Sequence, residues 1–205
     1  MESIYHRQVL ERAIGGQVSP RALGAILVAN LDQDSLRGLL RPEYHFDNSL
    51  FAEGLAFMET ARQAAARATR PAAAWDAFGR LTHAAQDFYS HSNYVALWLE
   101  EHTGAGPEAI DGLEPSVLRH PRLVSGRIYL PLEALTLYPA LRPLLKRCLP
   151  RDSHAWMNLD SPATGPLFPY SLEAAAQRTL AEFERTLAAI GEEQGEGAMA
   201  AFLDR

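Results

Sequence analysis

The sequence contains a single cysteine, Cys148, among its 205 residues. A lone cysteine excludes a disulfide within the chain and a zinc site built from several thiolates. Any metal ion would therefore be held by nitrogen and oxygen ligands, which means mainly histidine and carboxylate side chains.

The sequence also lacks long apolar runs and an excess of positive charge. No segment approaches the roughly 18 consecutive apolar residues of a membrane-spanning helix, and the N-terminus has no apolar core of a secretory signal. We therefore expect no transmembrane segment and a cytoplasmic location. The net charge is −6 and the basic residues are scattered, so we expect no stable complex with nucleic acid. The oligomeric state is not indicated.

What is present is typical of an ordinary globular protein, with 47% hydrophobic and 21% charged residues. A chain of this length is most economically one domain, spanning residues 1–205. We find no internal repeat and no alternation of strands and helices, so the predicted fold is all-α, a compact multi-helix bundle.

Apolar spacing and capping residues predict where the helices lie. The expected helices are 3–14, a segment opening at Ser19-Pro20, 50–68, 72–102, a proline-interrupted helix over 132–149, 171–190, and a short tail helix over 197–205. The stretch SGRIYLP, residues 125–131, reads as a short strand.

The most informative motif is HAAQDFYSHSN, residues 83–93. His83, Asp87 and His91 are spaced by four residues, so on a helix they form one stripe within about 80° and point toward the same side. Two plainer interpretations stay open: separate polar residues hydrogen-bonded in the core, or a solvated helix face. Among the other histidines, His45 and His154 also stand close to acidic or amide residues, which favours a dispersed zinc site of imidazoles and carboxylates.

The longer stretch HAAQDFYSHSNYVAL, residues 83–97, resembles the signature of the Het-C-like proteins, which are similar to zinc-dependent phospholipases C and single-strand-specific zinc nucleases. The resemblance extends to an early helical His6, to Asp32 or Asp34, to HFDN at 45 and to His154. It implies a helical domain of the zinc-dependent phospholipase C type with two or three zinc ions.

Carried over to this chain, the resemblance implies a metal-ligand set, with Asp34 preferred to Asp32. One ion would have Asp34, His45, His83 and Asp87, a second would have Asp87 and His6, and a third would have His91 and His154 with Asp160 as a replacement carboxylate. The chain departs from the phospholipase and nuclease pattern at the Met-Glu start, at Asn93 and at Asn158, so one or two ions are easier to defend than three.

The resemblance implies a zinc-dependent phosphoesterase, phospholipase C-like rather than nuclease-like, acting on a lipid or a small phosphoester. Asp32 or Asp47 would orient or deprotonate the attacking water. The alternatives are a Het-C-like interaction protein of the toxin or immunity type that keeps a metal-stabilised fold without hydrolysis, and a metalloenzyme acting on another small molecule.

Overall fold

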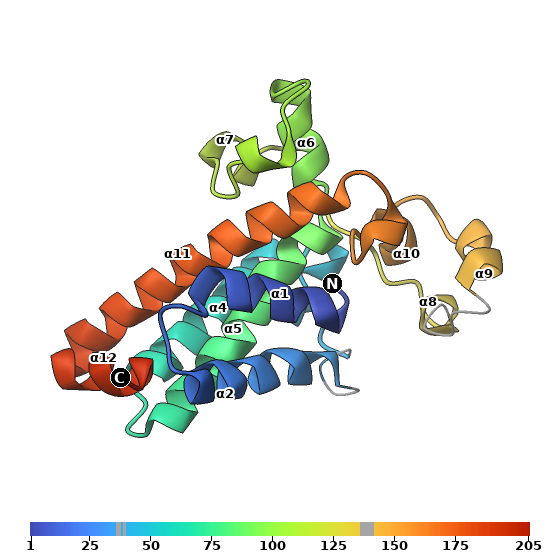
Figure 1. The fold of residues 1–205 in the computed structure, drawn as a ribbon. Helices are drawn as coiled ribbons and strands as arrows, with labels where there is room; N and C mark the ends of the chain where they lie inside the picture. The colour runs from blue at the N-terminus through green and yellow to red at the C-terminus, as the bar shows by residue number, and fades with distance from the viewer. Residues whose placement is uncertain (36–37, 39, 136–141) are drawn as a thin grey trace.

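Helix α5, Pro71–His91, lies at the centre of the molecule and packs against α2, α4 and α11 (Figure 1). The structure is a computed structural model that describes residues 1–35, 38, 40–135 and 142–205. Almost every residue of α5 from Ala74 onward is buried. Other helices surround α5 on most sides, so its polar residues are buried together with its apolar ones.

The predicted all-α fold is confirmed, and no strand occurs in the described ranges. The longer helices are α1 (Ser3–Ile14), α2 (Pro20–Leu31), α4 (Phe51–Ala66), α5, α6 (Tyr94–Glu101), α11 (Phe168–Gln194) and α12 (Glu196–Leu203). The short helices are η1 (Asp32–Asp34), η2 (Pro42–Tyr44), η3 (Asp47–Ser49), η4 (Pro107–Ala109), α7 (Pro115–Leu118), α8 (Leu132–Leu135), α9 (Arg142–Cys148), α10 (His154–Met157) and η5 (Pro162–Thr164). No described helix is long and apolar enough to cross a membrane.

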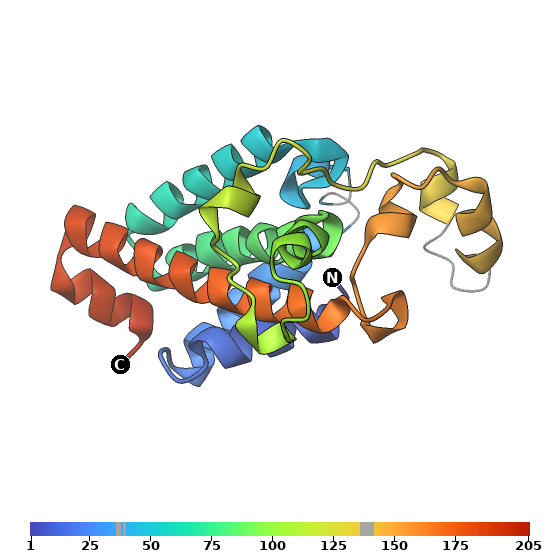
Figure 2. The ribbon, with the colours of Figure 1, turned by 90° about the horizontal axis from the view of Figure 1, so that it is seen from above.

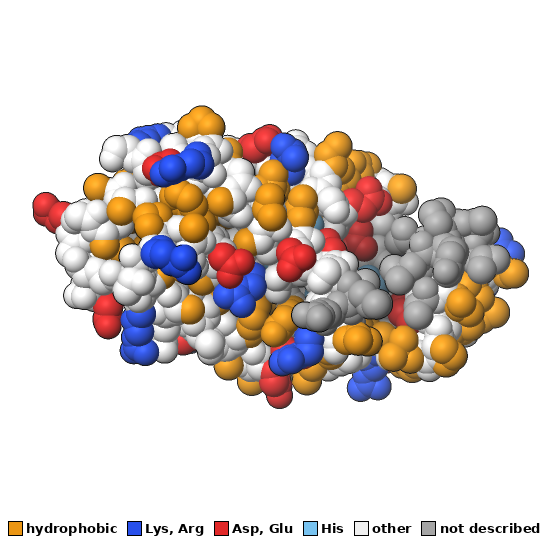
Figure 3. All heavy atoms as spheres, turned by 90° about the horizontal axis from the view of Figure 1, so that it is seen from below, with side chains coloured by type: hydrophobic (Ala, Val, Ile, Leu, Met, Phe, Trp, Pro, Cys, Tyr) orange, Lys and Arg blue, Asp and Glu red, His pale blue; other side chains and the backbone are white. Residues whose placement is uncertain are grey.

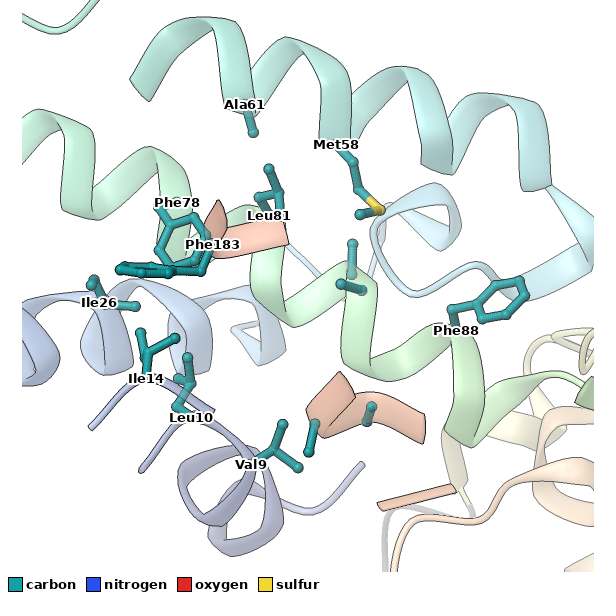
Figure 4. Close-up of a cluster of buried hydrophobic side chains, with 14 of the residues drawn as sticks. Val9, Leu10, Ile14, Ile26, Met58, Ala61, Phe78, Leu81, Phe88 and Phe183 are labelled. Carbon is teal, nitrogen blue, oxygen red and sulfur yellow. The ribbon is translucent and has the colours of Figure 1, made fainter. Parts of the chain in front are cut away.

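The hydrophobic core lies where α1, α2, α4 and α11 meet α5. Figure 4 shows Leu10 and Ile14 of α1 near Ile26 of α2, with Phe78 of α5 and Phe183 of α11 beside them. All five side chains are buried. In Figures 1 and 2, α8 and α9 lie to one side of this bundle, beyond α10.

Two predicted elements differ in the structure. The expected helix over 72–102 breaks after His91, because Ser92 Oγ donates to the Phe88 carbonyl while Asn93 bonds Arg122 O and Val124 N at 2.9 and 2.8 Å. The expected strand 125–131 is wrong, because this segment forms only two isolated bridges, Ser92 to Ser125 and Arg127 to Ser153. Part of the helix expected over 132–149, residues 136–141, lies outside the described residues.

The contact between α2 and α5 depends on Gly79. A Cβ atom at this position would lie 2.7 Å from the Ala29 Cβ and would overlap the Ile26 carbonyl oxygen. The two helices therefore approach as closely as a glycine allows.

Gly79→Ala should lower the free energy of unfolding by about 1–3 kcal/mol, because the added methyl forces α2 away from α5. Gly24→Ala is the control: it lies within α2, has open space at its Cβ position, and should be neutral or stabilising by up to about 1 kcal/mol. Urea unfolding of both variants measures the difference. Equal effects would contradict the close-approach argument.

A buried carboxylate, Glu182 of α11, joins α11 to α4. Its oxygens accept from Arg62 Nη2 at 2.6 Å, Arg178 Nε at 2.7 Å and Arg185 Nη1 at 3.0 Å. Burial acts to raise the pKa of Glu182, but Arg178 and Arg62 outweigh it and hold the pKa below its usual value. The charged form is therefore the one that the folded state stabilises.

Glu182→Gln should destabilise the protein by about 1–3 kcal/mol at pH 7, because the arginines lose their shared carboxylate. The folded-state pKa is lowered, so this stabilisation is present above pH 4.5, the ordinary glutamate value, and is lost as the pH falls below it. Unfolding curves at pH 7 and below pH 4.5 should therefore show the gap between wild type and variant narrowing in acid. A constant gap would exclude Glu182 as the source.

Candidate metal centre

The Asp87 carboxylate is the central polar group of the molecule and is completely buried on α5. Its Oδ2 lies 2.8 Å from His45 Nδ1 and 3.0 Å from His83 Nε2. Its Oδ1 lies 3.3 Å from His6 Nε2 and 2.7 Å from the amino group of Met1. The two oxygens therefore face two different sets of partners.

We call the set on the Oδ2 side the central cluster, which consists of Asp34, His45, His83 and Asp87. One ligand atom from each of these residues lies within 4.8 Å of the others, and the group could hold a metal ion. His83 and Asp87 are one turn apart on α5, His45 follows η2, and Asp34 ends η1. Three separate segments of the chain thus meet at one point.

The spacing within the central cluster is close to that of a tetrahedral coordination shell. His45 Nδ1 and His83 Nε2 are 3.1 Å apart, and Asp34 Oδ1 lies 3.6 Å from His83 Nε2. A tetrahedral zinc ion with bonds of 2.0–2.2 Å keeps its ligand atoms about 3.3–3.6 Å apart. His45, His83 and Asp87 are slightly inside that separation at 2.8–3.1 Å, the Asp34–His83 distance of 3.6 Å is at its upper end, and all four ligand atoms lie within 4.8 Å of one another.

A second set, which we call the outer cluster, consists of Asp47, His91 and His154 and could also hold a metal ion. Asp47 Oδ1 lies 3.0 Å from His154 Nδ1 and 3.4 Å from His91 Nδ1. His91 Nδ1 also lies 3.0 Å from the His45 carbonyl oxygen. Hydrogen bonds alone therefore account for much of the outer cluster.

His6 takes its orientation from a buried amide network. Its Nδ1 lies 2.6 Å from Gln86 Oε1, which also accepts from Asn30 Nδ2 at 3.3 Å, while Gln86 Nε2 donates to Thr179. With Nδ1 as the donor, His6 Nε2 is an acceptor that faces Asp87 Oδ1, and it has no hydrogen-bond partner. A buried acceptor pair of this kind requires a cation nearby.

The cation beside Asp87 Oδ1 in the structure is the Met1 amino group. This group also lies 3.0 Å from Asp160 Oδ1 and 3.4 Å from His91 Nε2. Burial acts to lower its pKa, but the attraction of Asp160 and Asp87 outweighs this effect and raises the pKa to about 11. The ammonium ion therefore balances part of the buried negative charge.

Burial and charge act differently on the two α5 histidines. Burial lowers the pKa of His83 to about 3, despite the nearby Asp87. Burial acts in the same direction on His91, but Asp87 and Asp47 raise its pKa well above the ordinary value. For Asp87 itself, burial is outweighed by the Met1 amino group and His91, which hold its pKa well below the ordinary value. A neutral imidazole is the metal-binding form, and His83 is neutral at pH 7.

The segment from His45 to Ser49 has a strained backbone conformation and contributes residues to both clusters. Phe46, Asn48 and Ser49 have φ values of 57–58°, the left-handed region that non-glycine residues avoid. His45 lies in the central cluster and Asp47, two residues later, lies in the outer cluster. Such strain, about 1–3 kcal/mol per residue, persists only where surrounding contacts impose it.

Those contacts come from residues 125–128, the segment for which the sequence predicted a strand. Ser125 exchanges hydrogen bonds with Ser49, and its hydroxyl also donates to the Phe46 carbonyl. Asn48 N donates to Gly126 O and Asn48 Oδ1 accepts from Ile128 N, both at 2.8 Å. The same segment reaches the other elements of the site, because Gly126 N donates to His91 O and His154 N donates to Arg127 O.

The structure brings together most of the predicted site residues. His6, Asp34, His45, Asp47, His83, Asp87, His91, His154 and Asp160 all lie in or beside the two clusters. Asp32, predicted as a catalytic residue, is exposed and has no contact with either cluster among the described residues. Asp47, predicted to act on water, contacts His91 and His154. The roles themselves, as ligands or catalysts, stay predictions.

The sequence interpretation missed Asn30 and the Met1 amino group. Asn30 is a fully buried polar residue at the end of the apolar helix α2, a position that could have indicated a buried network. His6, His83 and Asp87 are fully buried, and Figure 3 shows a small area of histidine surface on the face drawn. Asp34, with 34% of its side chain exposed, is the most accessible member of the central cluster.

The fold and site define an all-helical domain with a buried centre of histidines and aspartates. Residues 4–103 match the family model of the VWA7 N-terminal domain. The chain is also similar to von Willebrand factor A domain-containing protein 7, at 41% identity in Rattus norvegicus and 40% in Mus musculus. Each similarity covers 80 residues, 37% of this chain and 9% of the relative, so the chain aligns with under a tenth of those proteins. No solved structure matched the chain.

These similarities correct the expected family. The interpretation as a Het-C-like member of the phospholipase C and zinc nuclease group is wrong, because the matching family model is the VWA7 N-terminal domain and no Het-C or phospholipase C family matches. The phospholipase C-like hydrolase function and the Het-C-like interaction role fail with it, since both rested on that resemblance. Enzymatic activity on another small molecule stays a prediction. A short helical motif of histidine and aspartate fixes a local geometry, which does not identify a family.

Proposed function

We propose that this helical domain binds one zinc ion through Asp34, His45, His83 and Asp87, and that the ion stabilises the domain. The observation that carries the proposal is the triangle formed by His45 Nδ1, His83 Nε2 and Asp87 Oδ2, with sides of 2.8, 3.0 and 3.1 Å. Each of the three is a ligand atom, and they converge on one point inside the molecule. A neutral imidazole carries a single N–H, so each of the two histidines can donate at most one hydrogen bond within this triangle.

The ligand types favour zinc over the hard divalent cations. Calcium and magnesium take six or more oxygen ligands or retain several waters, whereas this cluster offers two imidazole nitrogens and two carboxylates within 4.8 Å of one another. Zinc readily accepts four ligands of this mixture. The absence of further cysteines is consistent with such a site.

A bound ion would link segments that the backbone leaves separate. It would connect η1 through Asp34, the strained segment through His45, and α5 through His83 and Asp87. Binding to the folded state alone stabilises that state by mass action. All four residues also lie within the range 4–103 that matches the VWA7 N-terminal domain.

The outer cluster does not support a second ion equally well. Its His91 Nδ1 already contacts a carbonyl oxygen, and its His154 lies outside residues 4–103. We therefore propose a stoichiometry of one. The second and third ions expected from the sequence, and the expectation of enzymatic activity, stay predictions.

Protein purified without added metal should contain about one equivalent of zinc by elemental analysis. Removing the ion with a chelator should lower Tm, and returning zinc should restore it. At zinc concentrations near a thousand times Kd, the stabilisation is about 4 kcal/mol, equivalent to about 8–16 °C for a chain of this size. A protein that is purified without metal and whose Tm does not change when zinc is added would refute the proposal. Two bound equivalents of zinc would refute the stoichiometry.

His83→Gln and Asp87→Asn should each abolish stoichiometric zinc binding, because each removes a ligand of the central cluster. His102→Gln is the matched control: His102 stacks on Trp98, away from both clusters, and its replacement should leave zinc content unchanged. Circular dichroism of each metal-free variant separates ligand loss from unfolding. Retention of one zinc by folded His83→Gln would contradict the assignment.

A further inference from the structure

An apolar pocket lies on the side of α5 away from the metal centre. It has a volume of about 350 Å³, within the range of small-molecule sites. Its floor is made by Phe46, Met58, Ala85 and Phe88, all buried. Figure 4 shows Met58 of α4 and Phe88 of α5 on neighbouring helices at this place.

The rim of the pocket is basic. Arg178 and Arg185 come from α11, and Arg119 comes from the turn after α7. In Figure 2, the segment that carries α7 runs above the space between α4 and α11. An apolar floor under three guanidinium groups is a strongly amphipathic surface.

The carboxylates around this rim do not balance its positive charge. Arg178 and Arg185 share Glu182 with Arg62, and within the described ranges Arg62 has one further ion pair, to Glu59. Among the described residues, Arg119 has no ion pair. The rim therefore keeps a net positive charge beside an apolar floor. A ligand that excludes water from this floor would strengthen the attraction between the rim arginines and its own anionic group.

We propose that this pocket binds an amphipathic carboxylate, with an aliphatic chain on the floor and the anionic group at Arg119 and Arg185. The chain would rest on the buried floor and cover the exposed Leu55 and the half-buried Phe51 and Leu123 on the pocket wall. Removing this apolar surface from water favours binding. Guanidinium groups form paired hydrogen bonds with carboxylates, which gives the charged end a fixed position. The proposal does not depend on metal binding, because none of the central-cluster residues lines the pocket.

The test is displacement of a fluorescent fatty acid, 11-(dansylamino)undecanoic acid, from the full chain. Dodecanoate below its micelle concentration should displace the probe, whereas hexanoate and the uncharged dodecanol should do so at least about tenfold less well, since each lacks one half of the recognition. Equal displacement by dodecanol would show that binding is apolar only and would overturn the proposed role of the arginines in binding the carboxylate. Failure of the probe to saturate would overturn the site.

Variants locate the site. Arg119→Gln with Arg185→Gln should weaken dodecanoate binding about tenfold, at about threefold for each partly exposed charge. Leu55→Gln at the mouth of the pocket should also weaken binding, because Leu55 is 51% exposed and lines the apolar wall.

The control pair, Arg7→Gln with Arg67→Gln, makes the same change in net charge away from the pocket and should leave binding unchanged. Thermal melting confirms that each variant is folded. Equal weakening by the control pair would reduce the effect to overall charge and overturn the proposed location.

Discussion

A carboxylate removed from water must be surrounded by positive charge or hydrogen-bond donors, and Asp87 places this requirement at the centre of the bundle. Its two oxygens collect partners from α1, α5 and the segment after η2. An isolated ion in such surroundings would be strongly destabilising. The arrangement of the N-terminal half is therefore constrained by one side chain as much as by apolar packing.

The helix that carries Asp87 is held by close packing on one side and by a buried polar network on another, and together they position the groups of the metal centre. Close contact with α2 at Gly79 fixes α5 four residues before His83. The amide of Gln86, bonded to Thr179 on α11, then orients His6 from α1. Packing sets the position of the backbone, and hydrogen bonds set the direction of the rings.

The local elements were largely predictable from sequence, whereas the contacts that join them were not. The helix 3–14 follows from apolar spacing and matches α1, but the predicted helix 72–102 ignored the side chains that end α5 at His91. The stripe of His83 and Asp87 was evident because helical spacing is regular. The setting of Asp47 was not, because it depends on left-handed residues and on a tie to residues 125–128, which lie far along the chain. Local periodicity contains no information about such distant pairs.

The strained segment connects the two proposed binding sites. His45 and Asp47 face the clusters of the metal centre, while Phe46 between them forms part of the pocket floor and contacts Phe88 with ring centroids 5.3 Å apart. Phe88 is in turn the neighbour of Asp87 on α5. The turn at the left-handed residue Phe46 thus places an apolar side chain of the pocket between two polar side chains of the metal centre. The left-handed residues Phe46, Asn48 and Ser49, held by hydrogen bonds to residues 125–128, are therefore a structural element that the two sites share.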